Sequence, residues 1–365
     1  MDERAGYLKG KFSRRVALKG FVGLTLTISG ISSAGCASPG PAPTVTPTHS
    51  ALPSTPSGVG ATLLVYTNHY QIVNTVAWSP DGTRIASGSQ TSESIVNIWN
   101  SVSGKTLLTY KGHMNDVDSV AWSPDGTRIA SGSRDGTVQI WDSTTGKLYL
   151  TYQGHAPEEV HSVAWSPDGT RIVSGSDKTV QVWESATGHR IFSYDGYKSF
   201  IYSVAWSPDG KRIASGSDDY TAQVWDDLQG EHRVLYRGHH REVYAVSWSP
   251  QSNRIASGSI DKTAQVWNPS TGQHFLTYSG HTLAVWVVAW SPRSTLVASG
   301  SQDETVQVWD GLTGKTVYTY QGHIADGRAP NQLPIGTVQT LAWSPGGKRI
   351  ASASQDNSVH VWRAS

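Results

Sequence analysis

The sequence predicts an all-β fold made of seven repeats, and two observations support this prediction. The first is the spacing of tryptophan: fourteen of the fifteen form seven pairs, with 18 to 21 residues within a pair. Successive pairs begin 41 to 44 residues apart, except for a last interval of 53. A period in the forties indicates an array of small structural units. The pairs are Trp78/Trp99, Trp122/Trp141, Trp165/Trp183, Trp206/Trp225, Trp248/Trp267, Trp290/Trp309 and Trp343/Trp362.

The second observation is the order of strands and turns within each repeat. The sequence Ser-Pro-Asp-Gly favours a tight turn, because Pro presets φ, Asp bonds its own backbone and Gly accepts positive φ. The segments beside it carry apolar or small residues on both faces, as in strands of stacked sheets. Each repeat therefore predicts four short strands, which in the second repeat lie at 117–124, 128–133, 137–141 and 148–152.

The repeats resemble the WD40 family in an opening Gly-His, an Asp in a later turn and a closing Trp-Asp. In the second repeat these residues are Gly112-His113, Asp135 and Trp141-Asp142. The resemblance covers about residues 61–365 and implies that each repeat forms one blade of a β-propeller. The implied fold is a seven-bladed propeller with four antiparallel strands in each blade.

The two ends of the repeat array are expected to close the ring. The last repeat ends three residues after Trp362 and lacks a fourth strand, whereas residues 63–67 precede the first repeat. That segment matches the fourth-strand sequence at 107–110. We expect the N-terminal strand to complete the C-terminal blade, because this pairing removes an open sheet edge.

Family resemblance also implies a hydrogen-bonded tetrad of His, Ser, Asp and Trp inside the blades. Because these histidines recur in copy after copy, we expect them to be structural rather than catalytic or metal-binding. Two repeats break the pattern, the first with His69 after Asn and Glu93 for Asp, and the fourth with Tyr197 for His. Blades 1 and 4 should be the least tightly braced. The implied tetrads are His113, Ser131, Asp135 and Trp141 in the second repeat, and His281, Ser299, Asp303 and Trp309 in the sixth.

The N-terminal segment 1–35 has a different composition and is expected to be an export signal. The sequence at 13–19 resembles a twin-arginine signal, with Ala17 where Phe is usual. The apolar stretch that follows is too short for a spanning helix, which needs about twenty residues. Ser33-Ala34-Gly35-Cys36 resembles a lipoprotein cleavage box, with Ser33 in place of Leu, and implies a lipid on Cys36. The alternative is that Cys36 is an ordinary thiol.

A Pro-, Ser- and Thr-rich segment, 36–60, is expected to be a linker between this signal and the propeller at 61–365. Six of the 29 basic and two of the 28 acidic side chains lie in residues 1–35, which leaves 23 basic and 26 acidic ones. This balance gives no case for nucleic-acid binding. We therefore expect an exported lipoprotein of a bacterial cell envelope, on the outer side of the cytoplasmic membrane; the alternative is a cytoplasmic protein.

Motifs for catalysis or cofactor binding are absent from the sequence. There is no phosphate-binding loop, no His-Glu-x-x-His, no Gly-x-Ser-x-Gly and no cysteine pair. The repeated Ser-Gly-Ser motifs are expected to let neighbouring sheets approach. We predict no catalytic residue, no metal and no cofactor.

Partners of WD40 proteins commonly contact the face that carries the Gly-His and turn-Asp loops. Blades 4 to 6 present apolar residues there, and rigid aromatics among polar groups are frequent interface anchors. The alternative is that these rings only fill the central channel. An insertion at about 325–336 is expected on the same face, as a lid or as a contact arm. The predicted partner-binding residues are Asp116, Asp118, Arg134, Glu159, Phe200, Tyr202, Tyr244, Ile260 and Trp286.

The leading hypothesis is a monomeric, non-catalytic scaffold that binds a protein or peptide and contacts the membrane only through a lipid on Cys36. One alternative is a glycan site at Tyr244 and Trp286. Another is a metal-dependent enzyme that uses Asp116, Asp118 and Glu159, and a third is a cytosolic scaffold.

Overall fold

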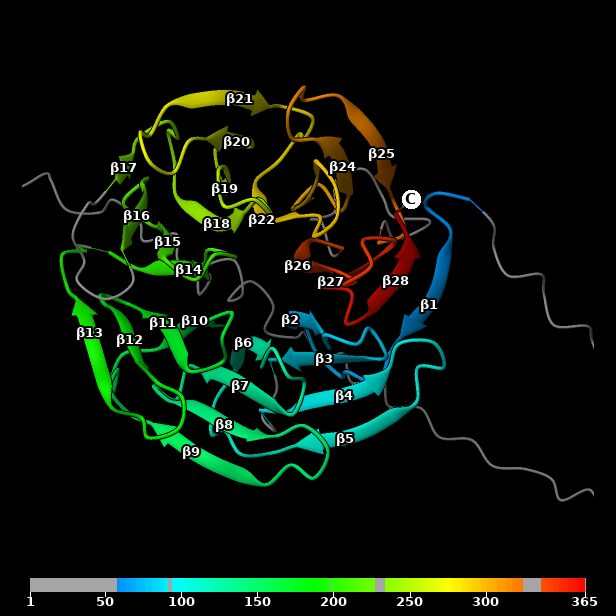
Figure 1. Cartoon of the computed structure of the whole chain (residues 1–365). Coiled ribbons are helices and arrows are strands. Elements are labelled where there is room, and N and C mark those ends of the chain that lie inside the picture. The colour runs from blue at the N-terminus through cyan, green and yellow to red at the C-terminus, as the bar shows by residue number, and fades with distance from the viewer. Residues whose placement is uncertain (1–57, 91–93, 198, 227–233, 324–335, 365) are drawn as a thin grey trace, which may run out of the picture. The chain divides into compact units, whose positions relative to one another are not determined.

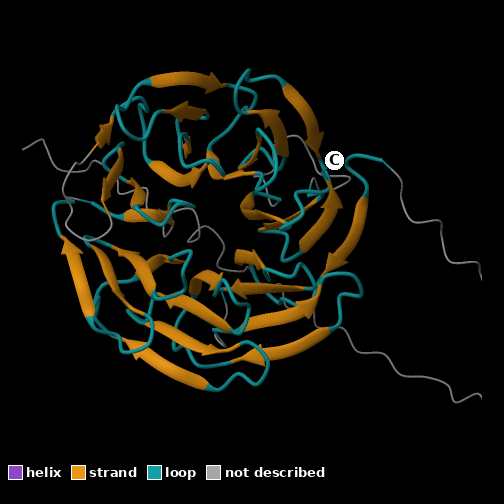
Figure 2. Ribbon diagram, in the orientation of Figure 1, coloured by secondary structure: helices purple, strands orange, loops and turns teal. Residues whose placement is uncertain are grey.

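The computed structural model describes residues 58–90, 94–197, 199–226, 234–323 and 336–364. Within these ranges the chain forms seven four-stranded antiparallel sheets arranged as blades around a ring (Figure 1). Strands and loops make up the whole described part, as Figure 2 shows. None of its segments is a helix long and apolar enough to cross a membrane. The predicted export signal, Cys36 and most of the linker and insertion lie outside the described residues.

The first four blades take their strands in sequence order, from the ring centre outwards (Figure 1). Blade 1 has β2 (Val73–Trp78), β3 (Arg84–Ser89), β4 (Val96–Asn100) and β5 (Thr106–Tyr110). Blade 2 has β6 (Val117–Trp122), β7 (Arg128–Ser133), β8 (Val138–Asp142) and β9 (Leu148–Tyr152). Blade 3 has β10 (Val160–Trp165), β11 (Arg171–Ser176), β12 (Val180–Glu184) and β13 (Arg190–Tyr194). Blade 4 has β14 (Ile201–Trp206), β15 (Arg212–Ser217), β16 (Ala222–Asp226) and β17 (Val234–Tyr236).

The remaining blades follow the same order, except that the seventh takes its outer strand from the N-terminal side. Blade 5 has β18 (Val243–Trp248), β19 (Ile255–Ser259), β20 (Ala264–Trp267) and β21 (His274–Tyr278). Blade 6 has β22 (Val285–Trp290), β23 (Leu296–Ser301), β24 (Val306–Asp310) and β25 (Thr316–Tyr320). Blade 7 has β26 (Val338–Trp343), β27 (Arg349–Ser354), β28 (Val359–Arg363) and β1 (Thr62–Tyr66).

Closure of the ring by the N-terminal strand is confirmed. β1 pairs antiparallel with β28, with Val65 opposite His360 and Tyr66 opposite Val359. The backbone N–H of Gly60 also donates to the carbonyl of Arg363 at 2.7 Å. Both ends of the array are therefore held in one sheet, and the edge of β28 is covered.

Turns between the first two strands of a blade have the conformation that Ser-Pro-Asp-Gly predicts. In blade 2, Gly126 has φ +71°, and Asp125 accepts hydrogen bonds from the hydroxyl of Ser123 and the backbone N–H of Thr127. The fifth repeat lacks this Gly, and Ser252 takes φ +57° in its place. The turn geometry is thus kept at the cost of a left-handed non-glycine residue.

Tryptophan and tyrosine form the core between blades. The second Trp of every pair is fully or almost fully buried. In six blades this ring stacks on a Tyr from the outer strand of the preceding blade, as with Tyr110 and Trp141 at 4.2 Å between ring centroids. Small residues let neighbouring blades pack closely, because a Cβ on Gly132 would lie only 2.9 Å from both Val160 and Val163 of the next blade. The Ser-Gly-Ser motifs therefore have the packing role that the sequence indicates.

Candidate functional site

Alternating strand direction brings two sets of loops to one end of the ring. These are the loops that lead into the first strand of each blade and the turns between its second and third strands. We call this end the loop face. It carries the Gly-His residues, the turn Asp residues and all the residues predicted to bind a partner.

Tetrad hydrogen bonds are complete in blades 2, 5, 6 and 7. In blade 2, His113 bonds Asp135 through Nδ1 (2.9 Å) and Ser131 through Nε2 (2.8 Å), while the indole N–H of Trp141 donates to Ser131 (3.0 Å). Blade 6 repeats this arrangement. Burial alone would raise the pKa of Asp303 in blade 6, but hydrogen bonds from His281 and its neighbours lower it to about 2. The tetrad groups bond one another, which suits a structural role.

Blades 1 and 4 break the tetrad, as expected from their sequences. In blade 1, His69 bonds Ser87 at 2.7 Å, but its buried Nδ1 has no partner within the described residues, which exclude position 93. In blade 4 the hydroxyl of Tyr197 bonds Ser215 in place of a histidine. The indole N–H of Trp225 is left buried without a partner among the described residues.

The expectation that only these two repeats depart from the pattern is wrong, because blade 3 lacks the Asp. His155 bonds Ser174, but its Nδ1 bonds the hydroxyl of Thr179 at 3.2 Å. Asp177 turns away and bonds His161 at 2.8 Å. The repeat has one residue fewer in this turn, and the gap of 18 between Trp165 and Trp183 was the signal. Burial without a carboxylate lowers the pKa of His155 to about 4.

Arg134 lies at the centre of the acidic residues predicted for blades 2 and 3. Its guanidinium bonds Asp118 through Nε at 2.9 Å and reaches Asp116 through Nη1 at 3.2 Å. Glu159 lies 3.9 Å from the same Nε. The three carboxylates therefore surround a cation that the chain itself supplies. A metal ion at these residues would have to displace Arg134.

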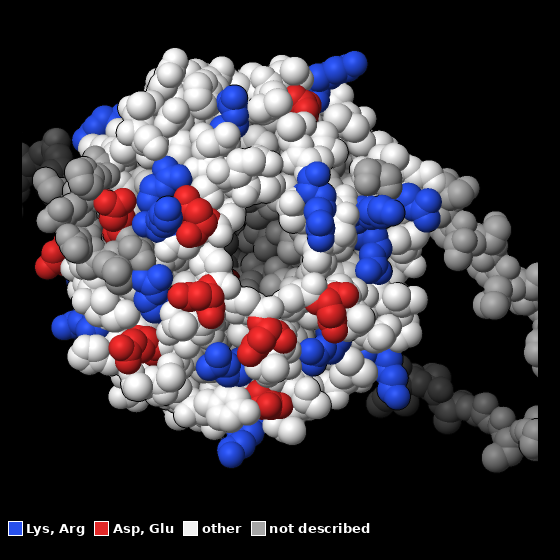
Figure 3. All heavy atoms as spheres, viewed as in Figure 1, with Lys and Arg blue, Asp and Glu red and all other residues white. Residues whose placement is uncertain are grey.

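The same cluster extends to His161, whose nitrogens lie 3.4 Å from Asp118 and 2.8 Å from Asp177. Burial alone would lower the pKa of His161, but these carboxylates raise it overall. Burial, with the nearby carboxylates of Asp118 and Glu159, raises the pKa of Asp116 although Arg134 opposes the shift. Four carboxylates thus face one Arg and one His, so negative charge is in excess here. Both signs of charge are mixed around the central opening on the face in Figure 3.

The aromatic residues predicted for blades 4 to 6 form a row of rings across the three blades. Phe200 stacks on Tyr202 and Tyr202 on Tyr244, and Tyr244 meets Trp286 edge to face, with centroids 6.3, 4.1 and 4.4 Å apart. Tyr202 and Tyr244 are buried, whereas Phe200, Ile260 and Trp286 are partly exposed. The two tyrosines therefore pack the row together. Only the other three have surface that a partner could contact without rearrangement.

Three large apolar side chains that the sequence analysis did not single out are exposed on the loop face. Tyr70 is 87%, Met114 94% and Tyr220 45% exposed. Tyr220 also has φ +71°, in a turn position that Gly136 occupies in blade 2. The same position has φ +73° at Lys262, +68° at Glu304 and +67° at Asn357, so this conformation belongs to the repeated turn. The sequence signal was a Tyr where other repeats have Gly or a polar residue.

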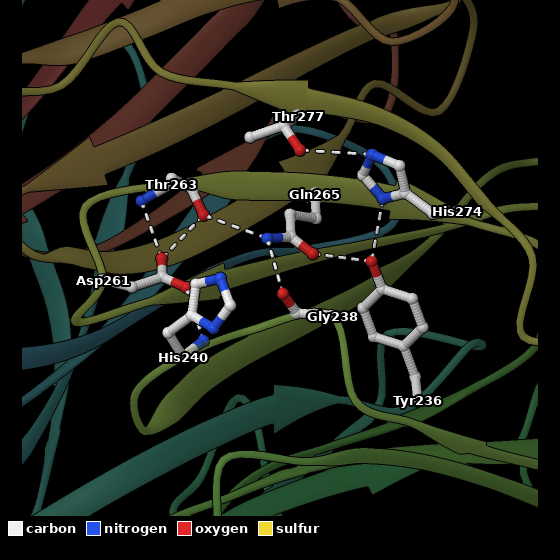
Figure 4. A pocket seen from close by; sticks show the side chains of 8 residues that line it. All are labelled: Tyr236, Gly238, His240, Asp261, Thr263, Gln265, His274 and Thr277. Atoms are coloured by element: carbon white, nitrogen blue, oxygen red, sulfur yellow. Dashed lines mark hydrogen bonds between the residues drawn. The ribbon is translucent and has the colours of Figure 1, made fainter.

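A surface pocket of about 350 Å³ lies beside blade 5 (Figure 4). The hydroxyl of Tyr236 donates to Gln265 at 2.6 Å, and the amide of Gln265 donates to the carbonyl of Gly238 at 3.2 Å. His274 lies within hydrogen-bond distance of both Tyr236 and Thr277. These polar groups satisfy one another, so the pocket gives no indication of a ligand.

Seven consecutive segments of the chain match the family model described as WD domain, G-beta repeat. The matched residues are 60–100, 104–142, 146–184, 188–226, 230–268, 272–310 and 314–363. The chain therefore belongs to the WD40 family, as the repeats indicated. Propellers of this family typically serve as protein-interaction scaffolds without catalysis. No match is found among curated proteins.

Proposed function

We propose that the protein is a non-catalytic scaffold that binds a positively charged segment of a partner protein on its loop face. The observation that carries this proposal is the excess of carboxylates around Arg134. Asp116 and Glu159 are partly exposed acids on either side of that guanidinium. A Lys or Arg of the partner would bind beside them, because complementary charge increases association rate and specificity.

Exposed apolar residues supply the second part of such an interface. Met114 follows the tetrad His of blade 2, and Tyr220 lies in the loop-face turn of blade 4. Phe200 and Trp286 add partly exposed rings on the same face. Large side chains surrounded by polar groups are typical binding anchors. The partner segment would therefore combine basic and apolar residues.

The test captures partners from the native envelope fraction with the full chain and then measures the Kd of the purified partner. Asp116→Asn with Glu159→Gln should weaken binding by about tenfold and reduce its salt dependence. Met114→Thr with Tyr220→Gly should weaken it by a similar factor, since truncating an anchor costs about 1 to 2 kcal/mol. Thr282 and Gly136 already occupy these positions in blades 6 and 2.

A matched control places Tyr149→Thr and Val317→Thr on the outer strands, where both side chains are also exposed. This variant should keep the wild-type Kd. Unchanged Kd values in both loop-face variants would contradict the proposal and move the interface to another surface.

We further propose that residues 1–35 direct export and that a lipid on Cys36 holds the protein on the outer side of the cytoplasmic membrane. The twin-arginine and lipoprotein-like sequences support this. An Arg14→Lys, Arg15→Lys variant should remain in the cytoplasm, and Cys36→Ala should leave the membrane fraction. A wild-type protein found in the cytoplasm would favour a cytosolic scaffold instead.

A further inference from the structure

One position in blade 7 carries a histidine where the other six blades carry Asn or Gln. In blade 6, Gln307 accepts from the hydroxyl of Tyr278 and donates to the carbonyl of Gly280 at 3.2 Å. His360 keeps the tyrosine contact, with its Nδ1 2.7 Å from the hydroxyl of Tyr320. Its Nε2 has no hydrogen-bond partner within the described part of the chain. The residues at this position in blades 1 to 6 are Asn97, Gln139, Gln181, Gln223, Gln265 and Gln307.

His360 lies directly beside the tetrad of its own blade. Its ring centroid is 4.1 Å from that of His323, and the Nδ1 of His323 lies 2.8 Å from Asp356. One ligand atom from each of the three residues lies within 4.8 Å of the other two. Both histidines are buried, while the side chain of Asp356 is 24% exposed, so the cluster reaches the surface on one side.

We propose that His323, Asp356 and His360 bind a divalent transition metal ion, with Zn²⁺ as the preferred ion. Two imidazole nitrogens and one carboxylate oxygen form a common zinc donor set, which leaves the fourth position for water or an external ligand. Bonds of about 2.0 to 2.2 Å in a tetrahedron place ligand atoms about 3.3 Å apart. The side chains therefore close around the ion by small rotations.

Each of the three ligands already has an outer partner that would orient it, as in established metal sites. Ser352 bonds His323 at 2.9 Å, and Ser358 donates to Asp356 through its hydroxyl at 2.6 Å. The hydroxyl of Tyr320 bonds His360. The contacts of Ser352 and Ser358 recur in the tetrads of blades 2, 5 and 6, whereas only blade 7 places a second histidine, His360, beside the tetrad.

Besides these small rotations, metal binding at these atoms needs a change of tautomer at His323. His323 moves its proton from Nδ1 to Nε2, where Ser352 accepts it, and thereby frees Nδ1 for the ion. His360 carries its proton on Nδ1 toward the oxygen of Tyr320, whose own hydroxyl can donate to Thr62 at 2.9 Å. The hydrogen bond between His323 and Asp356 is exchanged for two metal bonds.

The test is a Zn²⁺ titration of the chelator-treated full chain with Cys36→Ser, followed by calorimetry and by the ligand-field spectrum of the Co²⁺ form. We expect one ion per chain, a tetrahedral Co²⁺ spectrum and a Tm that rises with Zn²⁺. His360→Gln should weaken the affinity more than about 100-fold, because it removes a direct ligand. Its Tm without metal should stay near the wild-type value, because Gln is native at this position in five blades.

Blade 6 offers a gain-of-site control. His281, Asp303 and Tyr278 repeat the arrangement around Gln307, and Tyr278 bonds Thr316 as Tyr320 bonds Thr62. Gln307→His should therefore add a second Zn²⁺ site. Failure of the wild type to bind Zn²⁺, or equal affinity after His360→Gln, would overturn the proposal.

Discussion

Blades 4 and 5 are neighbours with nearly the same strands, yet they differ in how their buried polar groups are satisfied. Both contain Ile-Ala-Ser-Gly-Ser followed by Ala-Gln-Val-Trp, at 213–217 and 222–225 and at 255–259 and 264–267. In blade 5, His239 joins Asp261 to Ser257, which also accepts from Trp267. Blade 4 has Tyr197 in place of this histidine.

Several buried polar groups of blade 4 differ from their counterparts in blade 5. Three of its side-chain atoms are buried without a partner among the described residues, namely Trp206 Nε1, Gln223 Oε1 and Trp225 Nε1. Its apolar core is as buried as that of blade 5. Apolar packing therefore forms the blade, and the tetrad adds stability on top of it. Because unsatisfied buried groups cost about 1 to 3 kcal/mol, blade 4 should open more readily than blade 5.

Replacement of the turn aspartate should give the largest difference in unfolding free energy between variants of the two blades. Asp261 accepts from His239, His240 and Thr263, so Asp261→Asn leaves buried donors without an acceptor and should cost about 3 kcal/mol. Asp219 accepts only within its own turn, from Thr221, among the hydrogen bonds of the described residues. Asp219→Asn should cost about 0.5 kcal/mol or less. Urea unfolding of both variants measures the difference.

Equal losses in the two variants would mean that the tetrad contributes no more than the turn itself. Burial alone would raise the pKa of Asp261, but hydrogen bonds with His239 and the turn lower it below its ordinary value. The stability that depends on the ionised form is therefore lost as the pH falls below about 4. Asp261→Asn should show a weaker loss than the wild type in that acid range.

Blade 3 sharpens the comparison, because it keeps the histidine and lacks the aspartate. The pKa of His155 is lowered by burial from 6.5 to about 4. In the unfolded chain this residue takes up a proton below about pH 6.5, whereas in the folded chain it does so only near pH 4. Stability should therefore fall by about 3 kcal/mol as the pH drops between these values. Unfolding free energies of wild type and His155→Gln measure this slope.

His155→Gln should reduce the slope of unfolding free energy against pH by the contribution of one proton. The slope that remains comes in part from His69, whose pKa burial also lowers. An NMR titration of the His155 ring provides the direct check. A pKa near 6.5 for this ring would contradict the prediction, because it would show that burial without a neighbouring carboxylate does not lower the pKa of His155.

The fold was predictable from the sequence because seven copies repeat the same local chemistry. Tryptophan spacing set the number of blades, and residues 63–67 identified the closing strand. The site was less predictable, because its geometry depends on contacts between blades. Spacing within a repeat does not show that Tyr202 packs under Tyr244, nor that Arg134 reaches Glu159 of the next blade. Because blade 3 has one residue fewer in this turn, Asp177 bonds His161 and not the tetrad histidine. Only a comparison of this repeat with the other copies reveals the shorter turn.

The indole N–H groups give the smallest and most direct test of the comparison. Trp267 donates to Ser257 at 3.1 Å, whereas the N–H of Trp225 has no partner among the described residues, and both rings are almost fully buried. Replacement by Phe removes similar volume at both sites, so the difference isolates the hydrogen bond. Trp267→Phe should cost about 1 kcal/mol more than Trp225→Phe, the usual net value of such a bond. Denaturant midpoints with unchanged m-values would measure it. If Trp225→Phe costs as much, the N–H of Trp225 must be satisfied in solution, and blade 4 is as well braced as its neighbour.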